Sequence, residues 1–471
     1  MAEKTKKRSF PDVYALLFIL CVIAMISTWI IPSGAFDRVA AGKINKVVAG
    51  SFHYIKGMPQ SPWDMLQCIY QAFLNSSPII FMIFFCGAAI GMLEETKSMS
   101  TAFTVMARKL RGKEAISIGV IMFSLGLGNA AGVFGNLGIA LLPIGVLLAR
   151  AIGGDNFLGF LIIYFGLMSG FAIGFANPGI VGFAQTLAEI PIFSGTLPRA
   201  ICCVINIIFL YCVTMSYYKK LKKDPTISLN YEDGMTVDQY MGNTSEANTS
   251  GEEVQLTKRQ MTIVTVFIIG VILCVGLTIK LSWSSKQIAA WFLGLAVIIG
   301  IISGFGANDI AKKFIKGCLP MVSASFVTGV ASAVALILSQ GKVMDTIVNA
   351  VSMPLGQMGP VAGAGFMVII NGLINILIPS GSGQAAVVMP LMVPMADLVG
   401  ITRQVAVQAF QFGDGLTNLA TPLNGPMMGC LAIAGVNFPK YFKWAIKYII
   451  IELLVAAVVT MGLQSIGWTG L

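Results

Sequence analysis

The feature that most constrains this chain is a pair of breaks inside long apolar runs. The first is GFANP at residues 174–178, and the second is GLTN at residues 415–418. Each follows another interruption rich in Gly, Asn or Ser, at residues 128–136 and 379–384. These residue types are poor helix formers, and backbone opened within a bilayer must be buried in protein or line a watery cavity. Two matching sets of broken helices predict the binding site of a transporter.

Composition supports a membrane setting. The chain has 471 residues, of which 56% are hydrophobic and 11% are charged, whereas a soluble domain carries roughly 25% charged residues. Several apolar runs approach or exceed the roughly 20 residues that span a bilayer. We therefore expect an all-α polytopic membrane protein with lipid around it. The net charge of +10 comes from short basic segments, so it requires no nucleic acid partner.

Few side chains suit catalysis or metal binding. The only histidine is His53, in a polar segment, and the nine cysteines show no metal-ligand spacing. A membrane enzyme is therefore not expected, and neither is a cofactor or a bound transition metal.

The basic segments predict the topology. Placing residues 4–8, 97–113, 219–223, 312–316 and 440–447 in the cytoplasm gives a cytoplasmic N-terminus and a C-terminus on the periplasmic or extracellular side. The first apolar run, residues 13–31, is long and lacks a small-residue cleavage site, which favours a retained span over a signal peptide.

Two runs, residues 115–152 and 361–399, are too long for one simple crossing. We predict a re-entrant helical hairpin in each, one entering from the cytoplasm and the other from outside. The alternative is two full crossings in each run, with arms of about 13–18 residues that are marginal for spanning. Broken helices are expected at 157–188 and 405–436. The chain then divides into a first inverted repeat (1–217), a cytoplasmic linker (218–260) and a second inverted repeat (261–471).

The interruptions offer amide and hydroxyl side chains beside free helix ends. Helix N-termini attract anions, and helix C-termini present carbonyls that can hold Na⁺. The structural alternative is that these small polar residues only pack helices closely. The predicted substrate-binding residues are Asn129, Asn136, Asn177, Ser380, Ser382, Gln384, Asp414, Thr417 and Asn418, and Na⁺ sites are possible near Asn136, Asn177, Ser382 and Asn418.

Two acidic residues lie deep within predicted spans. Asp414 stands in the second break where the first has Ile173. A charge at the centre of a membrane helix costs roughly 2.5–3.5 kcal/mol on insertion scales, so such a residue is a candidate for function. Asp414 could pair with a substrate guanidinium or ammonium, hold a coupling cation, or act as a protonated structural donor. Glu452 has no neighbouring break and is interpreted as a structural or proton-carrying group. The interruptions contain no Lys or Arg.

Several segments resemble the YfcC-like branch of the anaerobic C4-dicarboxylate carrier family, within the ion transporter superfamily. They are TWIIPSG at 28–34, IPSGSGQA at 378–385, GITRQ at 400–404 and FQFGDG at 410–415. The resemblance implies a homodimer with a fixed scaffold and a transport domain that moves as an elevator. Members of this branch include proteins regarded as arginine/ornithine exchangers, while the family name points to dicarboxylates. The tip here is SGSG and not the SNT of related Na⁺ symporters, so their ion ligands do not carry over.

The expected function is therefore a secondary active transporter of the bacterial inner membrane that exchanges cationic amino acids. Residues 13–93 and 288–338 would form the scaffold and the dimer surface. One alternative is a Na⁺- or proton-coupled carrier for C4-dicarboxylates, short-chain fatty acids or other carboxylates. Another is an ion channel, although the sequence shows no rings of charge that would line a pore.

Overall fold

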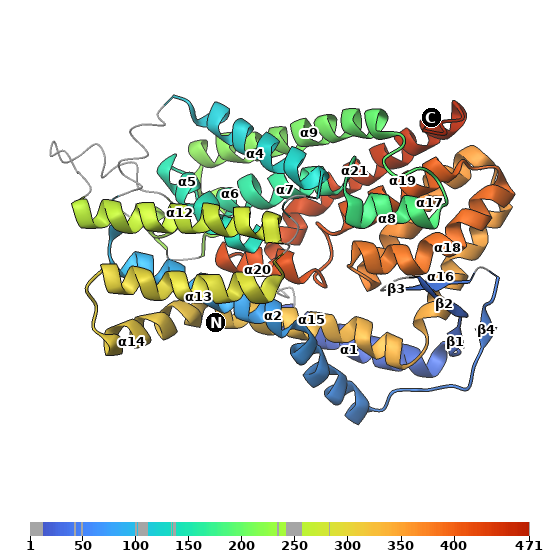
Figure 1. Cartoon of the computed structure of the whole chain (residues 1–471), viewed down its shortest axis with the longest axis horizontal. Helices are drawn as coiled ribbons and strands as arrows, with labels where there is room; N and C mark the ends of the chain where they lie inside the picture. Colours follow the sequence, from blue (N-terminus) through green and yellow to red (C-terminus); the bar gives the residue numbers. More distant parts are fainter. Residues whose placement is uncertain are drawn as a thin grey trace, which may run out of the picture.

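The computed structural model describes residues 13–470 except 42–43, 49, 99–100, 102–111, 133, 135–137, 233–234, 242–256 and 282. Its helices form two groups. In Figure 1, α1, α2, α14 and α15 run along the lower side of the molecule, and α4, α9 and α21 lie above them.

The first group, called the scaffold group here, is built around one long helix. Helix α2 packs against α13, α14 and α15, and α1 packs against α15. The members are α1 (Val13–Ile30), α2 (Pro62–Glu95), α12 (Lys258–Leu281), α13 (Ser285–Ile302), α14 (Ala307–Cys318) and α15 (Val322–Gln340). Helix α2 starts at Pro62, ends at Glu95 and contains Pro78 in its interior.

The second group, called the broken-helix group, contains both breaks. Helix α4 packs against α7 and α9, while α17 packs against α19 and α21. In the first half it comprises α4 (Glu114–Ala130), α5 (Gly138–Ala151), α6 (Asn156–Phe160), η1 (Leu161–Phe165), α7 (Gly166–Phe171), η2 (Pro178–Gly182), α8 (Phe183–Leu187) and α9 (Thr196–Lys223). In the second half it comprises α17 (Pro360–Leu377), α18 (Gly381–Val399), α19 (Arg403–Thr417), α20 (Gly425–Ile433) and α21 (Phe438–Ser465).

The predicted interruptions coincide with helix ends. Both long runs are divided into two helices, α4 and α5 in the first and α17 and α18 in the second. The first break separates α7 from η2, and Gly174 there has a positive φ of 54°, a conformation that glycine adopts without strain. The second break separates α19 from α20.

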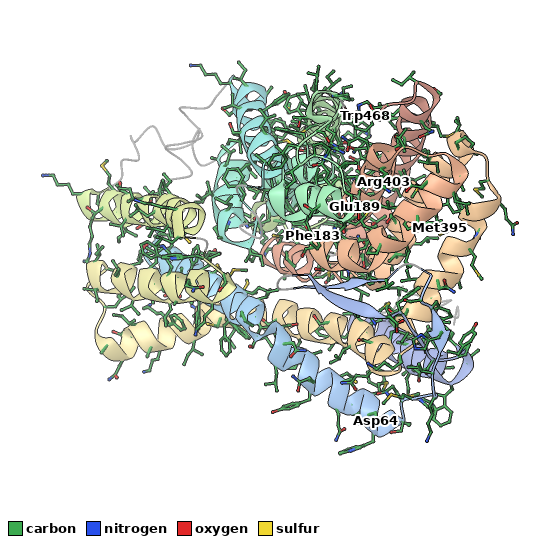
Figure 2. The ribbon with its side chains drawn as sticks, turned by 45° about the vertical axis from the view of Figure 1, so that its right-hand side comes forward. Asp64, Phe183, Glu189, Met395, Arg403 and Trp468 are labelled. Carbon is green, nitrogen blue, oxygen red and sulfur yellow. The ribbon has the colours of Figure 1, made fainter. Side chains whose placement is uncertain are left out.

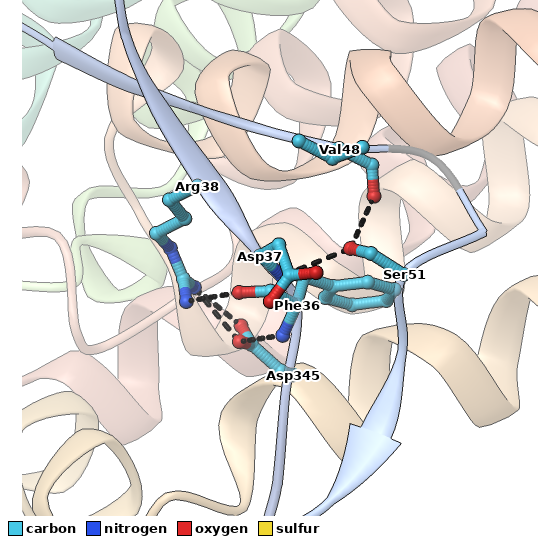
Figure 3. A network of polar contacts seen from close by, with 6 residues as sticks. All are labelled: Phe36, Asp37, Arg38, Val48, Ser51 and Asp345. Atoms are coloured by element: carbon cyan, nitrogen blue, oxygen red, sulfur yellow. Dashed lines mark hydrogen bonds and ion pairs between the residues drawn. The ribbon is translucent and has the colours of Figure 1, made fainter.

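Four short strands depart from the all-α expectation. Strand β1 (Gly34–Ala35) pairs with β4 (His53–Tyr54), and β2 (Arg38–Ala41) pairs with β3 (Ile44–Val47), both antiparallel. Asp345, on α16 (Met344–Ser352), binds this region: its carboxylate accepts from Arg38 Nη2 at 2.7 Å and from the backbone N–H of Phe36 at 3.1 Å (Figure 3). The sequence gives little sign of these strands, because they are short and this part of the chain contacts a residue about 300 positions away.

Four helices among the described residues are long and apolar enough to cross a membrane, namely α2, α9, α17 and α21. A fifth span results if the residues 332–340 and 344–355, which are bent by 91°, are counted as one. The other apolar helices are shorter, among them the segments 114–130, 138–151 and 156–171. The chain is accordingly a helical membrane protein with several spans.

Helix α9 continues to Lys223, into the segment 218–260 that is predicted as a linker. Two residues of this segment, Ser228 and Asn230, bond the broken-helix group. Ser228 Oγ donates to Asp155 Oδ2 at 2.5 Å, and Asn230 Nδ2 donates to the carbonyl of Ala434 at 2.6 Å. The linker also contains η3 (Pro225–Ile227) and α10 (Val237–Tyr240).

Candidate functional site

A cavity of about 490 Å³ lies where the two interruptions and the two breaks meet. It is lined by both halves of the broken-helix group and by one residue each from α2 and α15, Ile79 and Ser332. The cavity therefore sits at the boundary between the two groups of helices. Its volume falls within the range of about 300–1,000 Å³ that small-molecule sites occupy.

Helix ends of both polarities line this cavity. The N-terminal ends of α5, α18 and α20 contribute Gly138, Gly381 and Gly425. The C-terminal ends of α4, α7 and α19 contribute Asn129, Phe171 and Asn418. Free N–H groups at helix N-termini favour a negative group, and free carbonyls at C-termini favour a positive one. The cavity can thus hold a molecule that carries both charges.

Five of the predicted substrate-binding residues line the cavity: Asn129, Asn177, Ser380, Ser382 and Asn418. Asn129 Nδ2 donates to the carbonyl of Leu167 at 3.0 Å. Its Oδ1 is buried without a hydrogen-bond partner in the described part of the chain. That oxygen is available to a ligand.

The second break is closed by its own amides. Asn424 Nδ2 donates to Asn418 Oδ1 at 2.9 Å, and Asn424 Oδ1 accepts from the N–H of Met427 at 3.0 Å. Asn418 Nδ2 in turn donates to the carbonyl of Asp414 at 2.9 Å. Side-chain caps of this kind satisfy backbone groups that a broken helix would otherwise leave unpaired.

Three predicted site residues lie behind the cavity wall instead of in it. Gln384, Asp414 and Thr417 are buried and are not part of the lining. Gln384 Nε2 donates to the carbonyl of Asn371 at 2.9 Å, and Thr417 Oγ1 accepts from Asn375 Nδ2 at 2.8 Å. These contacts are structural in this conformation. Asn136 lies outside the described residues.

Asp414 is separated from the cavity by one glycine. A Cβ atom built on Gly381, which lines the cavity, would lie 3.1 Å from Asp414 Oδ2. Asp414 is 0% exposed, and neither carboxylate oxygen has a hydrogen-bond partner among the residues that the structure describes. Among the described residues that line the cavity there is no Lys, Arg, Asp or Glu. Asp414 is therefore the carboxylate that most directly affects the potential at the tip of α18.

Sequence reasoning missed a glutamine-rich face on α19. Gln404, Gln408 and Gln411 recur at a helical spacing, and all three are buried. Gln411 Nε2 donates to the carbonyl of Phe171 at 2.7 Å, which ties α19 to the first break. The spacing of three and four residues was the available signal, because it places these amides on one side of a helix.

The same face binds a buried arginine. Arg199, at the start of α9, donates from Nε to Gln408 Oε1 at 2.6 Å and from Nη2 to Gln404 Oε1 at 2.8 Å. Its guanidinium also lies 5.4 Å from the ring centroid of Trp468. This network joins the N-terminal ends of α9 and α19 to Trp468, and none of its three residues on these helices lines the cavity.

Arg403 is likewise engaged elsewhere. Its guanidinium bonds Asp397 at 2.8 Å and Glu189 at 3.2 Å. Figure 2 shows Arg403 beside Glu189, in the broken-helix group and far from Asp64 on α2. It does not line the cavity, as expected from its place at the start of the second broken span.

Comparison with known proteins gives full-length matches. The family described as C4-dicarboxylate anaerobic carrier matches residues 10–465. The chain is 27% identical over 507 residues to an Escherichia coli K12 protein named "Putative basic amino acid antiporter YfcC", with 99% of each chain covered. It is 26% identical over 506 residues to an uncharacterized protein of Haemophilus influenzae, with 97% of each covered.

Two solved transporter structures are also similar. The YdaH transporter of Alcanivorax borkumensis gives a TM-score of 0.43 at 14% identity, covering 98% of this chain and 100% of that one. MtrF of Neisseria gonorrhoeae gives a TM-score of 0.40 at 16% identity, covering 97% and 95%. The family match spans nearly the whole chain. The protein is therefore a multi-pass secondary transporter, not an enzyme, and it belongs to the C4-dicarboxylate anaerobic carrier family.

Proposed function

We propose that this protein exchanges cationic amino acids of the arginine/ornithine type across the bacterial inner membrane. The observation that carries the proposal is the position of Asp414. This unpaired carboxylate lies directly behind Gly381, and Gly381 is part of the wall of a cavity whose described lining carries no charge of its own. A cationic side chain placed at Gly381 would gain from the negative potential there, which solvent screens little because Asp414 is fully buried.

The helix ends suit the other groups of an amino acid. The substrate carboxylate would accept from the free N–H groups at the start of α18 or α20, near Ser382 and Gly425. The α-ammonium would lie near the carbonyl-rich ends of α4 and α19, with Asn129 Oδ1 as an acceptor. Each charged group of the substrate would then face helix ends of the opposite polarity.

We further propose an inverted repeat and an elevator motion. Corresponding helices have corresponding neighbours: α4 with α7 and α9 matches α17 with α19 and α21, and α5 against α20 matches α18 against α8. The cavity draws Ile79 and Ser332 from the scaffold group. If the broken-helix group slid along the scaffold group, other scaffold residues would take the place of Ile79 and Ser332, and the rest of the cavity lining would stay the same. The scaffold group would also hold the homodimer contact.

A second candidate is a carboxylate carrier coupled to Na⁺ or protons. Three helix N-termini at one cavity, together with the family description, favour this possibility. Na⁺ could then lie near Asn177, Ser382 or Asn418, which line the cavity. Such a carrier would take up substrate when driven by an ion gradient, with no counter-substrate inside.

The deciding experiment measures exchange of labelled arginine in proteoliposomes. We expect uptake by the wild-type protein to require internal ornithine or arginine and to be insensitive to C4-dicarboxylates. Asp414→Asn should reduce exchange by about tenfold or more, since losing one interaction of about 1.4 kcal/mol is a factor of ten. Asp397→Asn, which alters a surface ion pair, serves as the matched acidic control. Unchanged exchange by Asp414→Asn would rule out the assigned role of this carboxylate.

A further inference from the structure

A second cavity lies on the opposite side of α19 from Asp414. It has a volume of about 220 Å³ and is formed by α9, α19, α21 and the first break. It shares no lining residue with the candidate substrate cavity. We call it the Glu452 pocket, because Glu452 is the one acidic residue in its lining as far as the structure describes the chain.

Glu452 has a buried carboxyl group without a charged partner among the residues that the structure describes. Glu452 is 6% exposed, and neither of its carboxyl oxygens makes a hydrogen bond of normal geometry with a residue that the structure describes. No described Lys, Arg or His forms an ion pair with it. The other strongly polar residue of the lining, Asn206, donates from Nδ2 to the carbonyl of Ser169 at 2.9 Å and also lies beside the Glu452 carboxyl, with which its amide interacts. The carboxyl therefore has unused bonding capacity directed at the pocket.

The mouth of the pocket is apolar and exposed. Ile205 on α9 is 58% exposed, and Ile451 and Val455 on α21 are 46% and 53% exposed. Both helices are long and apolar enough to cross a membrane. Large apolar side chains exposed along such helices face acyl chains and not water. A molecule would reach Glu452 from the lipid.

Helix packing alone does not require an acid here. Helices α9 and α21 both have 28 residues, and the fifteenth residue is Glu452 in α21 and Leu210 in α9. Leu210 is 0% exposed, so an apolar side chain fills that place in the first half. An uncompensated carboxylate in a membrane helix is costly, and such residues mark sites of function.

We propose that the Glu452 pocket binds a lipophilic amine from the bilayer, with Glu452 as its counter-ion. The amine arrives as the neutral base. The O–H bond of the protonated carboxyl breaks, an N–H bond forms, and the products are a carboxylate and an alkylammonium ion that pair in a dry pocket. The alkyl chain lies against Ile205, Ile451 and Val455 at the mouth. This site is separate from the proposed substrate cavity and does not depend on the identity of the transported substrate.

The other titratable groups near this pocket are few among the described residues. Cys202 on α9 lines it. On α19, Phe412 and Leu416 line it, whereas Asp414 between them lies against Gly381 in the wall of the substrate cavity. On α21 itself, Tyr441 donates its hydroxyl to the carbonyl of Leu419 at 2.8 Å. Glu452 is therefore the group that should determine the charge preference of the pocket.

The test uses the purified full-length protein in detergent and dicyclohexylcarbodiimide, an apolar reagent that adds to protonated carboxyl groups. We expect an adduct on the peptide that contains Glu452, absent from Glu452→Gln and retained in Asp414→Asn. Octylamine should protect Glu452 from the reagent, while octanol should protect weakly and octanoate not at all. Arginine, a ligand for the other cavity, should give no protection.

A second variant covers the case in which Glu452→Gln does not fold. Val455→Phe fills the mouth of the pocket and leaves the carboxyl in place, and it should weaken protection by octylamine by about tenfold, or about 1.4 kcal/mol. Equal protection by octylamine and octanol would overturn the proposal, because the charge would then be irrelevant. Equal labelling by a water-soluble carbodiimide would also overturn it, because the carboxyl would then face water.

Discussion

At the scale of single residues, the candidate site depends on a glycine, Gly381, whose lack of a side chain lets a ligand come close to Asp414. Gly381 lines the cavity, and a Cβ atom built on it would lie 3.1 Å from Asp414 Oδ2. The sequence identifies Asp414 because an acidic residue within an apolar run is unusual. It does not reveal that Asp414 lies behind the wall, because that position depends on how α18 packs on α19.

Gly381→Ala tests this arrangement. The added methyl group would lie 3.1 Å from Asp414 Oδ2 and 2.8 Å from Ile180 Cδ1. We expect the Kd for arginine to rise by about tenfold or more as the methyl separates the ligand from the carboxylate. The measurement is a binding titration on purified protein. Gly294→Ala, where a Cβ meets nothing within 4 Å, is the control and should bind normally. An unchanged Kd in Gly381→Ala would contradict the proposed contact.

At the scale of helices and strands, the breaks were predictable and the strands were not. Gly, Pro and Asn act locally on the backbone, so the interruptions at 128–136, 174–178, 379–384 and 415–418 could be identified without tertiary information. The continuity of α2 through Pro78 could not be predicted in this way. A proline within a membrane helix is tolerated when neighbouring groups satisfy the backbone carbonyl that it leaves unpaired, and those neighbours are known only from the fold. The segment that joins β1 to β2 is bound by Asp345, which is distant in sequence, so its strands could not be predicted from local pattern.

Close backbone contact between the halves gives a stability prediction. A Cβ on Gly415 would lie 2.3 Å from Ala172 Cα and 2.7 Å from the Ala172 carbonyl oxygen. Main-chain atoms cannot move aside as a flexible side chain can, so Gly415→Ala should cost about 1–3 kcal/mol, the usual range for overpacking. The observable is a lower midpoint of thermal unfolding in detergent. Gly462→Ala, with open space around its Cβ, should not lower the midpoint; equal midpoints for both variants would show that α19 and the first break separate easily.

At the scale of the whole molecule, the arrangement follows from two groups of helices with a cavity at their boundary. The basic segments predict which ends of these helices face the cytoplasm. The number of complete crossings was harder to predict, because hydropathy alone does not distinguish a short apolar helix from a spanning one. Only four single helices in the described part of the chain are long and apolar enough to cross a membrane.

Reporter fusions test the predicted orientation. Alkaline phosphatase, which is active only outside the cytoplasm, should be active when fused after Leu471 and inactive when fused after Asp224 in the linker. A fluorescent protein that folds in the cytoplasm should give the opposite pattern. If phosphatase fused after Leu471 were inactive, the number of crossings would differ from the predicted number by an odd number, and the predicted topology would be wrong.

The amide contacts that close the second break have a thermodynamic consequence. Because Asn418 and Asn424 already bond each other and the ends of α19 and α20, the loop has little conformational entropy to lose when a ligand arrives. A preorganised loop retains more of its contact energy as affinity than a loop that must first become ordered. Calorimetry of ligand binding at this cavity should therefore show only a small unfavourable entropy of binding. The heat-capacity change should reflect desolvation alone, without the large negative value that accompanies coupled folding.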